Sequence, residues 1–110
     1  MLVSSIQNWY ETLPERFVAN ASKGVNAVFQ FELAGESGGT YHVKVNDGTI
    51  ETFVGPSEKP DATLKMKAED YLKMTNGQLS GTMAFMKGQL KVSGNVMLAQ
   101  KLQAILPPHK

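Results

Sequence analysis

The sequence predicts an α+β fold of two layers, in which helices cover one face of a five-stranded sheet and the other face meets solvent. Near both ends of the chain, apolar residues recur every three or four positions, which is typical of amphipathic helices. In between, the apolar period changes to two, which is typical of strands. Most strands combine an apolar face with a polar face rich in lysine, as expected when only one side of a sheet is covered.

The first helix is predicted by an apolar stripe that follows a capping residue, either Ser4 or Ser5. The stripe consists of Ile6, Trp9, Tyr10, Leu13 and Phe17. Pro14 should interrupt this helix, because proline lacks an amide hydrogen, and should open a second short helical turn. We expect the helical segment to end at residues 22–24.

Two strands are predicted at residues 27–33 and 41–46, where apolar and polar side chains alternate. Their expected inward residues are Ala27, Phe29, Phe31, Leu33, Tyr41, Val43 and Val45. Gln30 and His42 should lie on the open face. Residues 35–39 form the turn between the strands.

A hairpin is predicted at residues 46–48, because an Asn-Asp-Gly turn adopts positive φ at little steric cost. It leads into a third strand at residues 49–54. The sequence leaves two inward faces open for this strand, either Ile50 with Val54 or Phe53.

The second half of the sequence predicts a strand at residues 62–67, two short helices at 68–75 and 79–87, and a strand at 90–93. A final helix is expected from Gly94-Asn95 to Pro107-Pro108. Glu69 and Asp70 should lie in the first helical turn of their segment, where the helix dipole favours negative charge.

Composition excludes several classes of function. None of the 110 residues is cysteine, which excludes disulfides, thiol catalysis and cysteine-based metal sites. His42 and His109 are the only histidines, and we expect neither a metal nor another cofactor. Residues 1–5 do not resemble a signal peptide, and no apolar run is long enough to span a membrane. We therefore expect one cytoplasmic domain over residues 1–110.

Charge is divided unevenly, with a net charge of −3 over residues 1–55 and +4 over residues 56–110. An anionic partner and solvated surface lysines both explain this division. RNA-binding sheets combine lysines with exposed aromatic residues that stack on bases. Phe29, Phe31 and Tyr41 are expected to point inward instead, so we expect no binding of nucleic acid.

Residues 35–39 match G-x-S-x-G, the pattern around the nucleophilic serine of α/β-hydrolases. That serine needs a strand-to-helix turn, whereas these residues join two strands, where glycine and serine favour a hairpin. We therefore expect that the chain is not an enzyme. A hydrolase that uses Ser37 remains an alternative, which loss of an esterase activity in Ser37→Ala would support.

Five of the six methionines lie in the second half: Met66, Met74, Met83, Met86 and Met97. Methionine fills ordinary cores, and it also forms deformable linings for flexible ligands. The interpretation as a ligand lining is favoured by the run Ala84-Phe85-Met86-Lys87-Gly88-Gln89-Leu90-Lys91-Val92-Ser93-Gly94-Asn95. It resembles the signature of the sterol carrier protein type-2 domain, in which such a run leads into a final helix. Further pieces agree in order, at residues 13–17, 61–64, 69–72 and 77–79 and in the Phe-x-Phe-x-Leu first strand.

This resemblance covers residues 5–106 and implies a mixed five-stranded sheet with an apolar tunnel between sheet and helices. It also implies non-catalytic binding and carriage of fatty acids, fatty acyl-CoA, sterols or phospholipids. From the inward-facing positions we infer the ligand-binding residues, which are Phe31, Val43, Leu64, Met66, Met74, Leu79, Met83, Met86, Leu98 and Leu102. Lys87, Lys91 and Lys101 are the candidates to attract a carboxylate or phosphate head group.

The expected partners are a lipid or acyl-CoA, with a transient membrane surface and a second copy of the chain as further candidates. Peroxisomal relatives end in a tripeptide of the Ser-Lys-Leu type, whereas this chain ends in Pro108-His109-Lys110. The alternative function is a protein-interaction or dimerisation module of the same fold, with its apolar surface covered by a partner.

Overall fold

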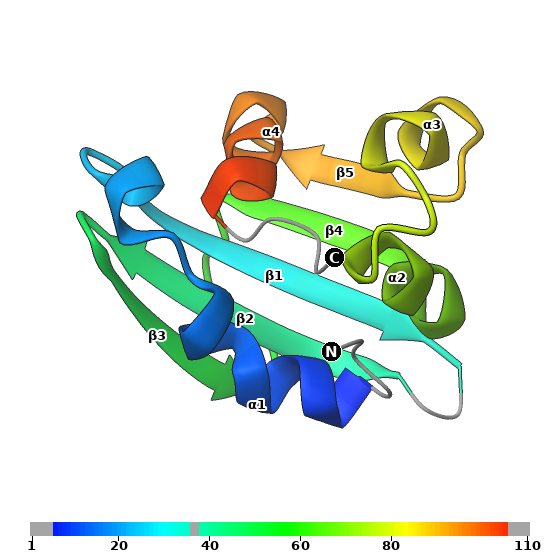
Figure 1. Ribbon diagram of the computed structural model, residues 1–110, viewed down its shortest axis with the longest axis horizontal. Helices are drawn as coiled ribbons and strands as arrows, with labels where there is room; N and C mark the ends of the chain where they lie inside the picture. Colours follow the sequence, from blue (N-terminus) through cyan, green and yellow to red (C-terminus); the bar gives the residue numbers. More distant parts are fainter. Residues whose placement is uncertain (1–5, 36–37, 106–110) are drawn as a thin grey trace.

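The computed structural model describes residues 6–35 and 38–105, and its elements follow the predicted order (Figure 1). They are α1 (Ile6–Arg16), the 3-10 helix η1 (Ala19–Ser22), β1 (Asn26–Ala34), β2 (Gly39–Asn46), β3 (Thr49–Val54), β4 (Ala62–Lys67), α2 (Ala68–Thr75), α3 (Gly81–Met86), β5 (Lys91–Gly94) and α4 (Val96–Ile105). Within the described residues, no helix is both long enough and apolar enough to cross a membrane.

The five strands form one sheet in the order β3-β2-β1-β4-β5. β1 and β4 run parallel, with Phe29 opposite Ala62, and the other neighbours are antiparallel. The sheet is therefore mixed. The helices lie on one side of it, which gives the predicted α+β arrangement of two layers (Figure 1).

An aromatic cluster fills the space between the sheet and the N-terminal helices. Trp9 of α1 makes edge-to-face contacts with Phe31 of β1 and Tyr71 of α2, at centroid distances of 5.1 and 5.0 Å. Trp9 also meets Tyr41 of β2 at 5.9 Å. Edge-to-face geometry is favourable for aromatic pairs. This half of the interlayer space is therefore packed core.

The predicted break at Pro14 is wrong, because α1 continues through this residue to Arg16. Proline removes one backbone hydrogen bond of this helix, and only Glu15 and Arg16 follow it in α1. A second short helix, η1, begins at Ala19 and not at Pro14, after an extended Val18. The amide of Val18 donates a hydrogen bond to the carbonyl of Ile105 (2.8 Å), which joins this segment to α4. The predicted caps Ser4 and Ser5 lie outside the described residues.

The open face of the sheet is partly covered, contrary to expectation. Gln30 is buried, and so is its cross-strand neighbour Thr63. The amide of Ser57 donates to Gln30 Oε1 (2.8 Å), and the carbonyl of Gly55 accepts from His42 Nδ1 (2.8 Å). The connection from β3 to β4 therefore crosses this face.

The ambiguous third strand turns Ile50 inward, where it packs against the core. Phe53 lies on the open face and stacks on His42, with ring centroids 4.7 Å apart. Asp47 and Gly48 both have positive φ, which confirms the hairpin turn.

The junction between β5 and α4 explains the Gly-Asn pair of the signature. Gly94 has a φ of +83°, and a Cβ atom there would lie 2.5 Å from the carbonyl oxygen of Asp61. Asn95 caps α4, since its Oδ1 accepts a hydrogen bond from the amide of Leu98 (3.2 Å). The amide of Asn95 donates to the carbonyl of Asp61 (2.8 Å). Gly94 and Asn95 of the signature therefore stabilise the backbone at the junction between β5 and α4.

Gly94→Ala should lower the free energy of unfolding more than Gly88→Ala, as measured by urea denaturation. Gly88 also has positive φ (+78°), but a Cβ atom at this position would meet open space, with no contact within 4 Å. Gly88→Ala should cost about 1–2 kcal/mol, for the left-handed backbone alone. Gly94→Ala adds a backbone clash, and we expect a total loss of about 3 kcal/mol. Equal losses would show that the close approach to Asp61 does not constrain residue 94.

Candidate functional site

An apolar cavity of ≈ 140 Å³ lies between the sheet and the C-terminal helices, beside the aromatic cluster. The strands contribute Leu64 of β4 and Val92 of β5 to its lining, and α2 contributes Tyr71 and Met74. Because Tyr71 also contacts Trp9, the cavity borders directly on the packed core. An apolar enclosure with deformable side chains suits an apolar ligand.

Three of the ten sequence-predicted ligand residues line this cavity, namely Leu64, Met74 and Leu102. The structure does not bring the others to it. Phe31, Val43 and Met66 are buried elsewhere, and Leu79 and Leu98 are partly buried against the core. The expected inward orientation of Met83 and Met86 is wrong, because both side chains are exposed on α3. In this short helix, Ala84 supplies the buried contact instead.

Sequence reasoning missed several lining residues: Tyr71, Phe85, Leu90, Val92, Val96 and Ala99. On α4 a usable signal existed, since Val96, Ala99 and Leu102 follow one another at intervals of three and share one helix face. For the other missed residues, an inward-facing position does not distinguish a side chain that lines a cavity from one that packs in the core.

The cavity reaches the surface between α3 and α4. Phe85 of α3 and Val96 of α4 both line it, and both side chains are large, apolar and partly exposed. An engineered cavity of about 150 Å³ admits benzene, so this cavity holds a segment of about six carbons. A longer acyl chain requires the helices to move apart or the chain to extend through the opening. The tunnel implied by the resemblance is not shown, and the described residues enclose this shorter cavity.

A second, open groove of ≈ 720 Å³ lies where the parallel strands β1 and β4 end. Four lysines line it, Lys65, Lys67, Lys87 and Lys91, together with the carboxylates of Glu32 and Asp70. The predicted head-group residues Lys87 and Lys91 therefore share one groove. The third, Lys101, is exposed on α4 and does not line the groove.

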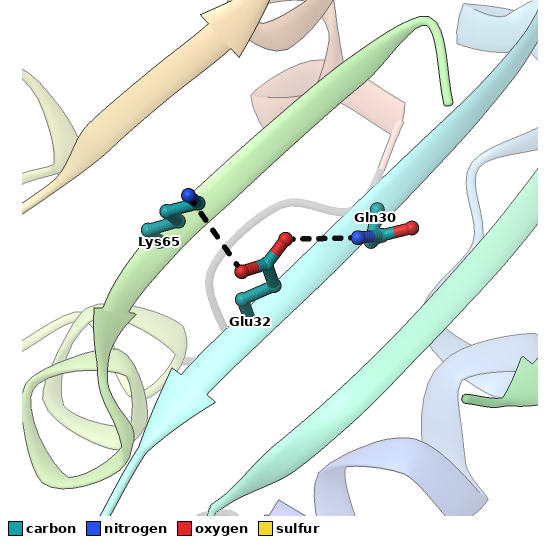
Figure 2. A network of polar contacts seen from close by, with 3 residues as sticks. All are labelled: Gln30, Glu32 and Lys65. Atoms are coloured by element: carbon teal, nitrogen blue, oxygen red, sulfur yellow. Dashed lines mark hydrogen bonds and ion pairs between the residues drawn. The ribbon is translucent and has the colours of Figure 1, made fainter. Parts of the chain in front are cut away.

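A polar network crosses the open face beside this groove (Figure 2). Glu32 accepts a hydrogen bond from Gln30 Nε2 (2.9 Å) and lies 3.8 Å from Lys65 Nζ. Lys65 also lies directly opposite Lys91 in the β4–β5 pair, and like charges in this position repel. An exposed ion pair contributes little, so Glu32 offsets this repulsion only in part. The groove therefore favours an anion.

The hydrolase alternative rests on Ser37, which lies outside the described residues, so the structure does not test it. His42 is held between Phe53 and the carbonyl of Gly55, in the structural contacts described above.

Comparisons with known proteins agree on one family. The sequence model of the SCP-2 sterol transfer family matches residues 10–107. Hydroxysteroid dehydrogenase-like protein 2 of Bos taurus is 36% identical over 104 residues, which cover 93% of this chain and 25% of that protein. The human protein of that name is 33% identical over 103 residues, again 25% of its length. The chain thus spans about a quarter of these curated relatives.

Solved structures share the fold. Palmitated SCP2L2 from Aedes aegypti has a TM-score of 0.73 at 25% identity, covering 99% of this chain and 97% of that chain. The sec-alkylsulfatase Pisa1 from Pseudomonas sp. has a TM-score of 0.78 at 16% identity, covering 97% of this chain and 16% of that chain. The second likeness concerns the fold alone.

Proposed function

Because the chain belongs to the SCP-2 sterol transfer family, we propose that it binds a long-chain lipid in the apolar cavity and carries it without catalysis. The observation that carries this proposal is an apolar cavity that opens between α3 and α4. The dehydrogenase in the relatives' name refers to much longer proteins, and we propose no such activity for this chain.

We propose fatty acids and fatty acyl-CoA as the ligand class, in cytoplasmic carriage. The Aedes aegypti protein was solved in a palmitated form, which supports an acyl chain in this fold. Burial of one methylene contributes about 0.8 kcal/mol, so a sixteen-carbon chain gains roughly 12 kcal/mol before binding costs when the helices move apart to enclose it fully. A bilayer offers nearly the same gain. The net free energy of transfer is therefore small, which suits a shuttle.

The preference for a ligand should come from its head group. Lys87 and Lys91 line a groove that carries excess positive charge and suits a carboxylate or phosphate, and Lys91 points to the face of the sheet opposite the cavity. Lys101 adds positive charge on α4. Selection by tail length should be weak, because an apolar enclosure distinguishes one methylene only modestly.

Delipidated protein should take up a fluorescent fatty acid saturably, with about one ligand per chain as the small size of the cavity implies. Palmitate and palmitoyl-CoA should displace it. Trp9, the only tryptophan, gives a second readout, because its ring lies 5.0 Å from that of the cavity residue Tyr71. Absence of saturable uptake would reject lipid carriage and favour the interaction-module alternative.

The head-group assignment is tested with the same titration. Charge reversal at Lys87, Lys91 and Lys101 should weaken displacement by palmitoyl-CoA about tenfold. Displacement by the uncharged sixteen-carbon alcohol should not change. Lys44→Glu, on the exposed side of β2, is the matched control. Unchanged acyl-CoA affinity in the triple variant would remove the three lysines from the site.

A further inference from the structure

The sheet has two edge strands, β3 and β5, which differ in how well they are protected against pairing with another strand. β5 is short, with four residues, and it begins with Lys91; short length and lysine both discourage pairing. β3 has six residues and contains neither lysine nor proline. Its register against β2 advances one residue at a time, so it has no bulge. In Figure 1 no described element lies along the outer side of β3.

The hairpin before β3 determines which of its backbone groups face outward. The turn consists of residues 47–48, so Asn46 and Thr49 form the first hydrogen-bonded pair of the ladder. Hydrogen-bonded pairs then recur at every second residue of an antiparallel ladder. The amide of Gly55 donates to the carbonyl of Thr40 (2.8 Å), in the same phase. The odd-numbered residues of β3 therefore direct their amide and carbonyl groups toward β2.

The even-numbered residues of β3 direct their backbone groups outward. They are Ile50, Thr52 and Val54. No backbone hydrogen bond from another described segment satisfies these groups. The side chains of the three residues share the helix side of the sheet, where Ile50 packs against the core and Val54 is 75% exposed. An added strand would pair the backbone groups and cover Val54.

A second copy of β3 matches this edge, because a two-fold axis makes an antiparallel pair of two identical strands. With Thr52 opposite Thr52 of the second copy, Ile50 lies opposite Val54 of that copy. Every outward-facing residue then lies opposite another one, and such pairs exchange hydrogen bonds. This register also places an apolar side chain against Val54 and extends the core across the contact.

The charges of the strand agree with this register. Glu51 is the only charged residue of β3, and Lys44 lies opposite it in β2. In the proposed register Glu51 lies opposite the uncharged Phe53 of the second copy. The next register would place Glu51 opposite Glu51, where like charges repel. The edge is therefore complementary to itself in one register, with no like charges opposite one another.

We propose that two copies of the chain pair antiparallel through β3, with Thr52 at the two-fold axis, and form one continuous sheet. None of the residues that line the apolar cavity belongs to β3, so both cavities stay accessible and the dimer does not depend on lipid binding. One pair of strands buries less area than the about 1,200–2,000 Å² of stable interfaces. The dimer should therefore be reversible and should form as the protein concentration rises.

Sedimentation velocity of the ligand-free chain across a concentration series tests the dimer. Val54→Lys should weaken dimerisation at least about tenfold, because a lysine replaces the apolar contact and protects natural edge strands. The variant should fold, since Val54 is exposed. Ser93→Lys, at an exposed residue of the opposite edge strand β5, is the matched control and should dimerise like the wild type. A wild type that stays monomeric up to its solubility limit, or equal dimerisation by Val54→Lys, would overturn the proposal.

Single cysteines test the register, because the chain contains none. Thr52→Cys should form a disulfide between copies under mild oxidation, since opposite residues of a hydrogen-bonded pair have Cα atoms about 5.5 Å apart, within reach of a disulfide. Glu51→Cys should react no faster than Ser93→Cys, which reports random collisions. Fast cross-linking at residue 51 instead of residue 52 would contradict the register. Fast cross-linking at residue 93 would place the contact at β5 and reject the proposed interface.

Discussion

Ala99→Phe should strongly weaken fatty acid uptake while leaving the protein folded. Ala99 is buried on α4 and lines the cavity. The cavity of ≈ 140 Å³ is close to the size that admits benzene, so one phenyl ring fills it. The ring would displace about six methylenes of a bound chain, each contributing about 0.8 kcal/mol. We expect affinity to fall at least about a hundredfold in the titration with fluorescent fatty acid, which corresponds to nearly 3 kcal/mol.

Stability provides the control for this substitution. A side chain that enters an existing cavity need not displace its neighbours, so the melting temperature should stay near that of the wild type. Val54→Phe adds an equally large ring at an exposed position far from the cavity and should leave uptake unchanged. Normal uptake by a folded Ala99→Phe protein would place the acyl chain outside this cavity and reject the proposed site.

The sequence predicted the strands well, because alternation reports directly on which side chains face the core. Phe29, Phe31 and Val43 are all fully buried as expected. It failed where a distant segment changes the environment. Gln30 looks like a solvent-facing residue, yet the connection from β3 to β4 covers it through a contact 27 residues away in sequence. No local pattern contains that information.

The candidate site was predicted less completely, for a related reason. An inward-facing residue can pack against a neighbour or face a void, and periodicity does not separate the two. Phe31 meets Trp9 and Tyr71, whereas Leu64 on the adjacent strand meets the cavity. Whether an inward-facing residue packs or faces a void therefore depends on where the bulky aromatic rings lie. α3 is shorter than the helix predicted at residues 79–87, and its six residues are too few to establish a periodic face, so the prediction that Met86 points inward is wrong.

Trp9→Ala should destabilise the protein by about 3–5 kcal/mol, the loss expected for truncating a large buried aromatic residue. Trp9 is almost fully buried and makes ring contacts with Phe31, Tyr41 and Tyr71. These contacts tie α1 and α2 to the sheet. Natural domains have about 5–15 kcal/mol of stability in total, so the loss would remove a large share of it. Urea denaturation should be followed by far-ultraviolet circular dichroism, because the variant lacks the only tryptophan.

The same variant decides whether the aromatic half of the interlayer space is core or ligand tunnel. If it is core, Trp9→Phe should lose less stability than Trp9→Ala, because an aromatic ring still fills most of the volume. Saturating palmitate should then stabilise both variants through the neighbouring cavity without restoring the lost packing. If Trp9→Ala instead lost little stability and gained affinity for longer acyl chains, the aromatic cluster would be a plug in a longer tunnel. The division into packed core and ligand cavity at Tyr71 would then be wrong.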